Sequence, residues 1–167
     1  MNKAFLAVLE DIDTLTRWLV IVCMASMIGV VSVQVLLRYG FAESLDWAEE
    51  VSRLAFVWAV FMAIPHGVKL GAHVGIDAAF KHFPAAAKAP IQVLIRIASA
   101  VLMGIVSVQA GMAAHDNWDQ LMPTLNLSSS WFYLAVTVGC AHSACHLVAQ
   151  VISGRGLVQP TQVEVAE

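Results

Sequence analysis

Residues 34–58 read QVLLRYGFAESLDWAEEVSRLAFVW and contain the junction between two strongly apolar stretches. The preceding stretch, residues 18–37, contains no charged residue and ends at Arg38 and Tyr39. The following stretch, residues 54–68, is again free of charge. Charged groups, aromatic rings and a turn therefore lie together between two apolar segments, which indicates a boundary between water and lipid.

The composition extends this interpretation to the whole chain. The 167 residues are 59% hydrophobic and only 13% charged, whereas a soluble domain has about 25% charged residues. A helix needs about 20 residues to cross a membrane. The second apolar run, residues 54–68, is shorter than this, but it reaches that length if helical turns carrying Glu49, Glu50 and Arg53 precede it. The long side chains of these residues can extend to the membrane interface. We expect an all-α integral membrane protein with four transmembrane helices and short amphipathic interfacial helices. The apolar stretches are residues 18–37, 54–68, 97–114 and 128–152.

The distribution of charge predicts the topology. Seven of the nine Lys and Arg residues lie before the first span, between the second and third, or after the fourth. Only Arg38 and Arg53 lie on the other side, so the positive-inside rule places both termini in the cytoplasm. The expected segments are a cytoplasmic amphipathic lead-in (1–17), TM1 (18–39), a periplasmic boundary segment (40–50), TM2 (51–70), a cytoplasmic loop with an amphipathic helix (71–90), TM3 (91–114), a periplasmic loop (115–127), TM4 (128–152) and a cytoplasmic tail (153–167).

Small residues recur at helical spacing in three of the spans and predict where helices pack closely. The second span offers one such stripe and the third another, while the stripe on the fourth combines three small residues with two histidines. The stripes are Ala55, Ala59, Ala63, Gly67, Gly71 and Gly75; Ala100, Gly104, Ser107, Gly111 and Ala114; and Ala135, Gly139, His142, His146 and Ala149.

Groups that could carry chemistry are sparse. No Asp, Glu, Lys or Arg lies near the centre of a span, where transport and proton-relay sites usually have one. No nucleophile motif, phosphate-binding loop or nucleic-acid patch is present, so we expect neither a catalytic nor a cofactor-binding nor a metal site. His142 and His146 share one helix face at a spacing that can bind a metal or haem. Hydrogen bonding between helices is the simpler interpretation.

The boundary segment resembles a known family. Residues 38–61, which include this segment, match the pattern RYxFxxSLxWAEExxRxxFVWxxF. Residues 73–77, HVGID, match a second element that follows in that family. Both are typical of the small membrane subunit of TRAP (tripartite ATP-independent periplasmic) transporters, the DctQ type, and the resemblance covers nearly the whole chain.

That resemblance implies a non-enzymatic subunit of a symport system in the bacterial inner membrane. A periplasmic solute-binding protein would capture an organic acid, and a large membrane subunit would carry it inward with sodium. The small subunit would brace the large one in the lipid bilayer and bind no cofactor, with sodium coupling in the large subunit. A four-helix cytochrome b-type membrane anchor of an oxidoreductase is the alternative, and a haem absorption band would identify it.

If the chain is such a transporter subunit, the boundary segment and the residues beside it have two expected roles. Ion pairs of Arg38 and Arg53 with Glu49 and Glu50 would fix the turn, those of Arg53 at helical spacing. Together with interfacial aromatic rings, they would anchor the segment and contact the partner subunit. Free acidic groups would help the binding protein to dock. The partner-interface candidates are Arg38, Tyr39, Ser44, Trp47, Glu49, Glu50, Arg53 and Trp58, and the docking candidates are Glu43, Asp46, Asp116 and Asp119.

Overall fold

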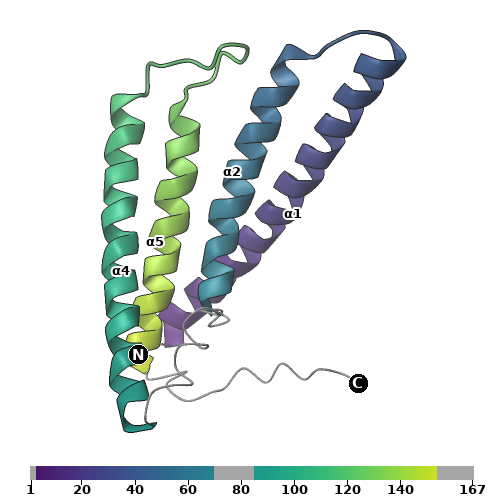
Figure 1. Ribbon diagram of the computed structural model, residues 1–167. Helices are drawn as coiled ribbons and strands as arrows, with labels where there is room; N and C mark the ends of the chain where they lie inside the picture. Colours follow the sequence, from purple (N-terminus) through teal and green to yellow (C-terminus); the bar gives the residue numbers. More distant parts are fainter. Residues whose placement is uncertain (1–2, 70–84, 154–167) are drawn as a thin grey trace, which may run out of the picture.

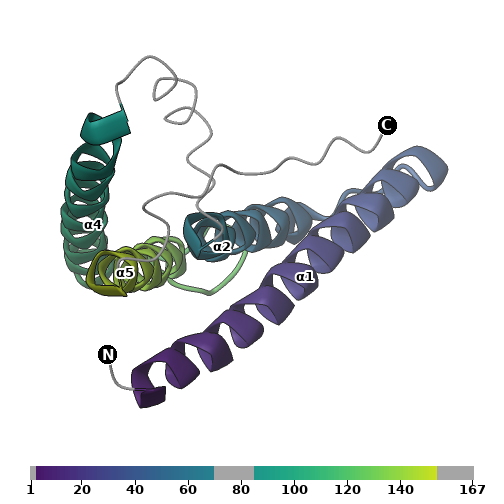
Figure 2. The same cartoon turned by 90° about the horizontal axis from the view of Figure 1, so that it is seen from below.

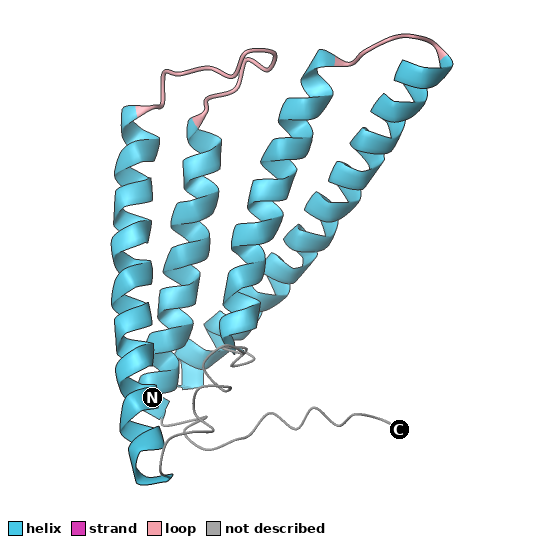
Figure 3. Ribbon diagram, in the orientation of Figure 1, coloured by secondary structure: helices cyan, strands magenta, loops and turns pink. Residues whose placement is uncertain are grey.

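The computed structural model describes residues 3–69 and 85–153, which form four helices joined by two described loops (Figures 1 and 3). The predicted all-α fold is confirmed, because all four helices are long and apolar enough to cross a membrane. The helices are α1 (Lys3–Gly40), α2 (Asp46–Lys69), α4 (Ala85–Asp116) and α5 (Ser130–Ser153).

The helices form an open arrangement in the spatial order α1, α2, α5, α4. The main contacts join α1 to α2, α2 to α5, and α5 to α4. Seen along the bundle, α4 and α2 extend from α5 in two directions roughly at right angles, and α1 runs obliquely past α2 (Figure 2). We call the end with residues 41–45 and 117–129 the loop end, and the end where α1 begins and α5 finishes the terminal end (Figure 1).

Helix α5 is the most buried of the four. The most apolar part of α1 and that of α4 bury no residue, whereas 44% of the corresponding part of α5 is buried. The stripe predicted on this helix is confirmed as its packing face, because all five of its residues are buried. At Gly139 the backbone of α2 comes so close that an added Cβ would lie 2.8 Å from the carbonyl carbon of Phe61. Close approach at a small residue is how helices associate in lipid, where no hydrophobic force draws them together.

The stripe predicted on α2 is correct only in part. Ala59 is buried, but Ala63 is exposed, and a Cβ added at Gly67 would meet open space. The buried face instead passes through Ala59, Met62, Pro65 and Val68. Steps of three residues fall short of the 3.6-residue helical turn, so these buried positions move around α2, which packs against both α1 and α5.

Several expectations concern residues 70–84 and 154–167, which lie outside the described part of the chain. They include the second family element at residues 73–77, most of the cytoplasmic loop expected to carry an amphipathic helix (71–90), and most of the tail. The lead-in expected at residues 1–17 lies mainly in α1, which continues from Lys3 to Gly40 without a break.

Candidate functional site

At the loop end, α1 finishes in a tight turn. The amides of Phe41 and Glu43 both donate to the carbonyl oxygen of Leu37, at 2.9 and 3.3 Å. Ala42, between them, has a φ of 55°, in the left-handed region that a residue with a Cβ adopts only at a cost. The chain then enters α2 at Asp46, and Asp46 and Glu49 place negative charge in its first turn, where the helix dipole favours it.

Two adjacent glutamates of α2 have different partners. The ion pair expected between Glu49 and Arg53 is present at 2.7 Å, with both side chains more than half exposed. Glu50 was expected to pair with Arg53 as well, but it faces the α4–α5 loop. Its carboxylate accepts the amide of Thr124 at 3.1 Å and that of Leu125 at 2.9 Å. Position i+4 reaches Arg53 from Glu49, whereas Glu50 points about 100° away around the helix.

The α4–α5 loop is itself ordered by hydrogen bonds that bring its two sides together. Met122 N donates to Leu127 O at 2.9 Å, and Ser129 N donates to Gln120 O at 2.7 Å. Glu50 therefore joins the tip of this loop to the first turns of α2. The contact ties the two halves of the bundle together at the loop end.

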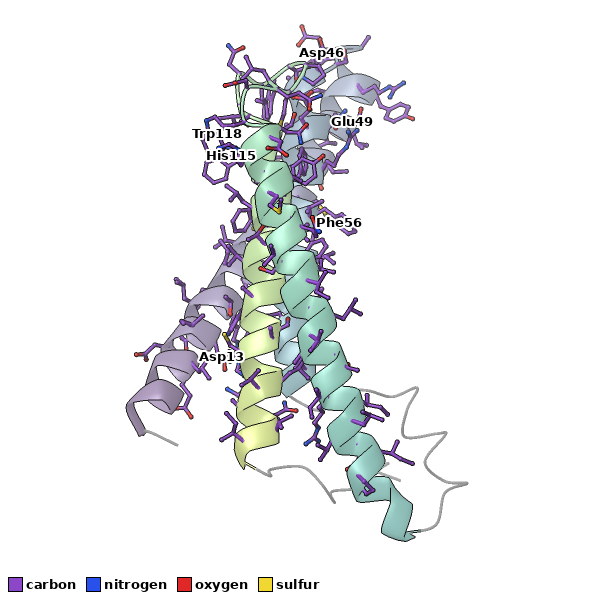
Figure 4. All side chains as sticks on the ribbon, turned by 90° about the vertical axis from the view of Figure 1, so that its left-hand side faces the viewer. Asp13, Asp46, Glu49, Phe56, His115 and Trp118 are labelled. Carbon is purple, nitrogen blue, oxygen red and sulfur yellow. The ribbon has the colours of Figure 1, made fainter. Side chains whose placement is uncertain are left out.

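The other boundary candidates lie mostly on the surface. The side chains of Arg38, Ser44 and Trp47 are exposed, and Tyr39 is 83% exposed. Trp58 is half-buried, and its ring centroid lies 6.4 Å from that of Trp131 on α5. The docking candidates Glu43, Asp46, Asp116 and Asp119 are all exposed. Figure 4 labels Asp46, Glu49, His115 and Trp118 together at the loop end.

An open groove of about 460 Å³ lies between α1 and α2 toward the loop end. Its walls are mainly apolar, and Glu49 and Arg53 contribute to its lining. Ser52 lines the groove, and its hydroxyl oxygen is buried and has no hydrogen-bond partner among the described residues. The lining residues are Met27, Ile28, Val31, Ser32, Glu49, Ser52, Arg53 and Phe56.

A largely buried set of polar side chains, which we call the terminal cluster, lies near the opposite end. It consists of side chains from α1, α2 and α5, and Figure 4 labels its Asp13 well away from Asp46 and Trp118. Asp13 Oδ1 lies 2.7 Å from His146 Nε2 and 3.1 Å from His142 Nε2, and Asp13 Oδ2 lies 2.5 Å from Lys69 Nζ. The cluster comprises Asp13, Thr16, His66, Lys69, His142 and His146.

This cluster gives the two histidines the interhelical hydrogen bonds expected of them, but their acidic partner was not predicted. The sequence predicts an amphipathic lead-in at residues 1–17 but gives Asp13 no role of its own. In the structure Asp13 and Thr16 face the bundle, whereas Leu15 and Trp18 are 69% and 62% exposed. A signal was available in the sequence. An acidic residue near the start of the first span and two histidines near the end of the fourth fall at the same depth if the spans are antiparallel.

Comparison with known proteins identifies the family. The family model described as tripartite ATP-independent periplasmic transporters, DctQ component, matches residues 27–156, more than half of the chain. The chain belongs to this family. DctQ components are subunits of transporters rather than enzymes, so the family expected from the boundary segment is confirmed.

Individual relatives agree with this assignment. The chain is 26% identical over 137 residues to a protein assigned as a TRAP transporter small permease in Haemophilus influenzae, covering 82% of this chain and 83% of the relative. It is 26% identical over 128 residues to the sialic acid TRAP transporter small permease protein SiaQ of Vibrio cholerae, covering 77% and 74%. It is 30% identical over 113 residues to the C4-dicarboxylate TRAP transporter small permease protein DctQ of Rhodobacter capsulatus, covering 66% and 49%.

Proposed function

We propose that this chain braces the large membrane subunit of a TRAP transporter during sodium-coupled uptake of an organic acid. A periplasmic binding protein delivers the acid to the complex, which lies in the bacterial inner membrane. Membership of the DctQ family supports the role of transporter subunit. The named substrates of the relatives, sialic acid and C4-dicarboxylates, are both organic acids and support the substrate class.

The observation that carries the bracing role is the groove between α1 and α2. A helix bundle that is complete in itself buries its polar side chains against partners, yet the buried hydroxyl of Ser52 has none among the described residues. The exposed Glu49–Arg53 pair lies beside it. A helix of the large subunit in this groove would cover apolar wall and offer polar groups to the exposed Glu49–Arg53 pair beside Ser52. Lipid tails could cover the wall but have no polar group to offer.

Two substitutions of the same kind test this surface. Val31→Trp fills the groove, whereas Val101→Trp places the same ring on an exposed position of α4 outside it. With the large subunit co-expressed, Val31→Trp should reduce the amount that co-purifies and Val101→Trp should not. Wild-type recovery with Val31→Trp would contradict the groove as the interface. Recovery of the small subunit alone from native membranes, active in transport, would contradict the bracing role altogether.

The proposed orientation places the loop end in the periplasm and both termini in the cytoplasm. It rests on the seven-to-two division of positive residues. Single cysteines at Ser44 and Ala85, in a background without other cysteines, should differ in labelling by a thiol reagent that cannot cross the membrane. Ser44→Cys should react in intact spheroplasts and Ala85→Cys only after lysis. The reverse pattern would invert the topology.

A further inference from the structure

Three possible metal ligands converge within the terminal cluster. Asp13 Oδ1, His142 Nε2 and His146 Nε2 are separated from one another by 2.7, 3.1 and 3.1 Å. The three side chains are between 5% and 8% exposed. They come from α1 and α5, helices at opposite ends of the sequence. Such a group of buried donor atoms differs from acidic side chains that gather on a surface, because water cannot easily solvate it.

Local structure orients each ligand toward the same point. His142 and His146 are one helical turn apart, with ring centroids 4.7 Å from each other, so both Nε2 atoms leave α5 on one face. Lys69 Nζ lies 2.5 Å from Asp13 Oδ2, which fixes the carboxylate and leaves Oδ1 toward the histidines. A charged partner on the second oxygen is the kind of outer contact that orients a metal-bound carboxylate.

The spacing is close to that of a tetrahedral site. Zinc binds histidine nitrogen and carboxylate oxygen at about 2.0–2.2 Å, so two ligand atoms at a tetrahedral angle lie about 3.3–3.6 Å apart. The observed separations are 2.7 to 3.1 Å, so they need to open by about 0.2 to 0.9 Å. Two imidazoles and one carboxylate form a ligand set that suits Zn²⁺ better than Mg²⁺ or Ca²⁺, which prefer oxygen.

Hydrogen bonds alone account less completely for this group. Asp13 Oδ1 can accept from both Nε2–H groups, but the two donor nitrogens then lie 3.1 Å apart with both hydrogens directed at one oxygen. A cation bound by both Nε2 lone pairs replaces the crowded hydrogens with attraction. The Lys69 charge opposes the cation, but its side chain is 47% exposed and water screens it in part.

We propose that Asp13, His142 and His146 form a three-ligand Zn²⁺ site that joins α1 to α5. A fourth position is left for water or for a group of a partner subunit. His142 and His146 lie within the segment that matches the family model, whereas Asp13 precedes it. The bound ion holds the first turns of α1 against the bundle, because metal binding stabilises the state in which its ligands are assembled.

Cobalt titration tests the site, with Co²⁺ as a visible probe for Zn²⁺. The full chain, purified with any membrane partner that accompanies it, is stripped of metal and titrated with Co²⁺ and then with Zn²⁺. Wild-type protein should bind one Co²⁺ per chain, with absorption bands of a four-coordinate ion that Zn²⁺ removes. Asp13→Asn, His142→Gln and His146→Gln should each weaken binding by more than about 100-fold, the upper end of what loss of an outer-shell contact costs.

His115→Ala is the matched control, because His115 is 91% exposed and lies at the loop end. It should bind Co²⁺ as the wild type does. Each cluster variant is compared only after its helicity and elution match the wild type. X-ray absorption of the Zn²⁺-loaded wild type needs no variant and should show two imidazoles around the ion. A shell without two imidazoles, or equal Co²⁺ binding by wild type and cluster variants, would overturn the proposal.

Discussion

The contact of α2 with α5 at Gly139 can be tested by adding a single methyl group. In Gly139→Ala the new Cβ would lie 2.8 Å from the carbonyl carbon of Phe61 and 2.9 Å from its Cβ, and it would also press on the carbonyl oxygen. Ordinary contact begins at 3.4 Å, so the helices must separate locally by at least 0.6 Å, the difference between 3.4 and 2.8 Å, and by more to clear the carbonyl oxygen, which is nearer still. The obstacle is largely backbone, which cannot rotate away as a side chain can.

The size of the effect follows from this geometry. Overpacking of this kind costs about 1–3 kcal/mol, and the better helix propensity of alanine returns at most about 1 kcal/mol. For a chain of this size 1 kcal/mol corresponds to roughly 2–4 °C in Tm. We therefore expect Gly139→Ala to lower the Tm of the detergent-purified protein by up to about 8 °C.

Gly111→Ala is the matched control. A Cβ at Gly111 would lie 3.6 Å from Thr137 Cγ2, an ordinary contact on the α4–α5 face. The same change of residue type is therefore expected to be neutral or slightly stabilising. Both Tm values are measured in one detergent and at one protein concentration. If Gly139→Ala is as stable as Gly111→Ala, the close approach of α2 and α5 does not determine the stability of the bundle.

Three further changes probe the loop end. Glu50→Gln should increase proteolysis of the α4–α5 loop, because a neutral amide accepts the two loop amides more weakly. Glu49→Gln removes the same charge without touching that loop, and equal proteolysis of the two variants would contradict this role of Glu50. The double variant Glu43→Lys with Asp46→Lys should slow uptake at low salt, and its uptake should approach that of the wild type as salt rises. Exposed charges act mainly on the rate at which the binding protein associates, and salt screens them. Uptake equal to wild type at every salt concentration would exclude docking of the binding protein at these residues. Ala42→Gly should raise Tm by a few degrees, because glycine adopts a φ of 55° without strain; a lower Tm would show that the turn does not store this strain.

The fold could be predicted because the membrane leaves few choices. Four apolar stretches of sufficient length can only become helices, since lipid offers no partner for an open backbone. The burial of Ala135, Gly139 and Ala149 followed from the same reasoning, because small residues mark close helix contacts. The family was evident from the boundary segment, where a charged and aromatic turn interrupts two spans. These inferences use local sequence only.

The terminal cluster needed information that local sequence does not hold. The periodicity of residues 5–19 gives α1 one apolar and one polar face, and in water the apolar face would turn toward the protein. In a membrane the preference can reverse: Leu15 is 69% exposed, while Asp13 is buried against His146 and Lys69. The decisive fact is which helices are neighbours, because a carboxylate enters the bundle only where cationic or hydrogen-bonding groups can receive it. Asp13 meets both kinds because α1 begins where α2 and α5 end. That pairing depends on the packing of residues 13, 69 and 146, so the spatial order of the helices had to be known before the polar face of α1 could be interpreted.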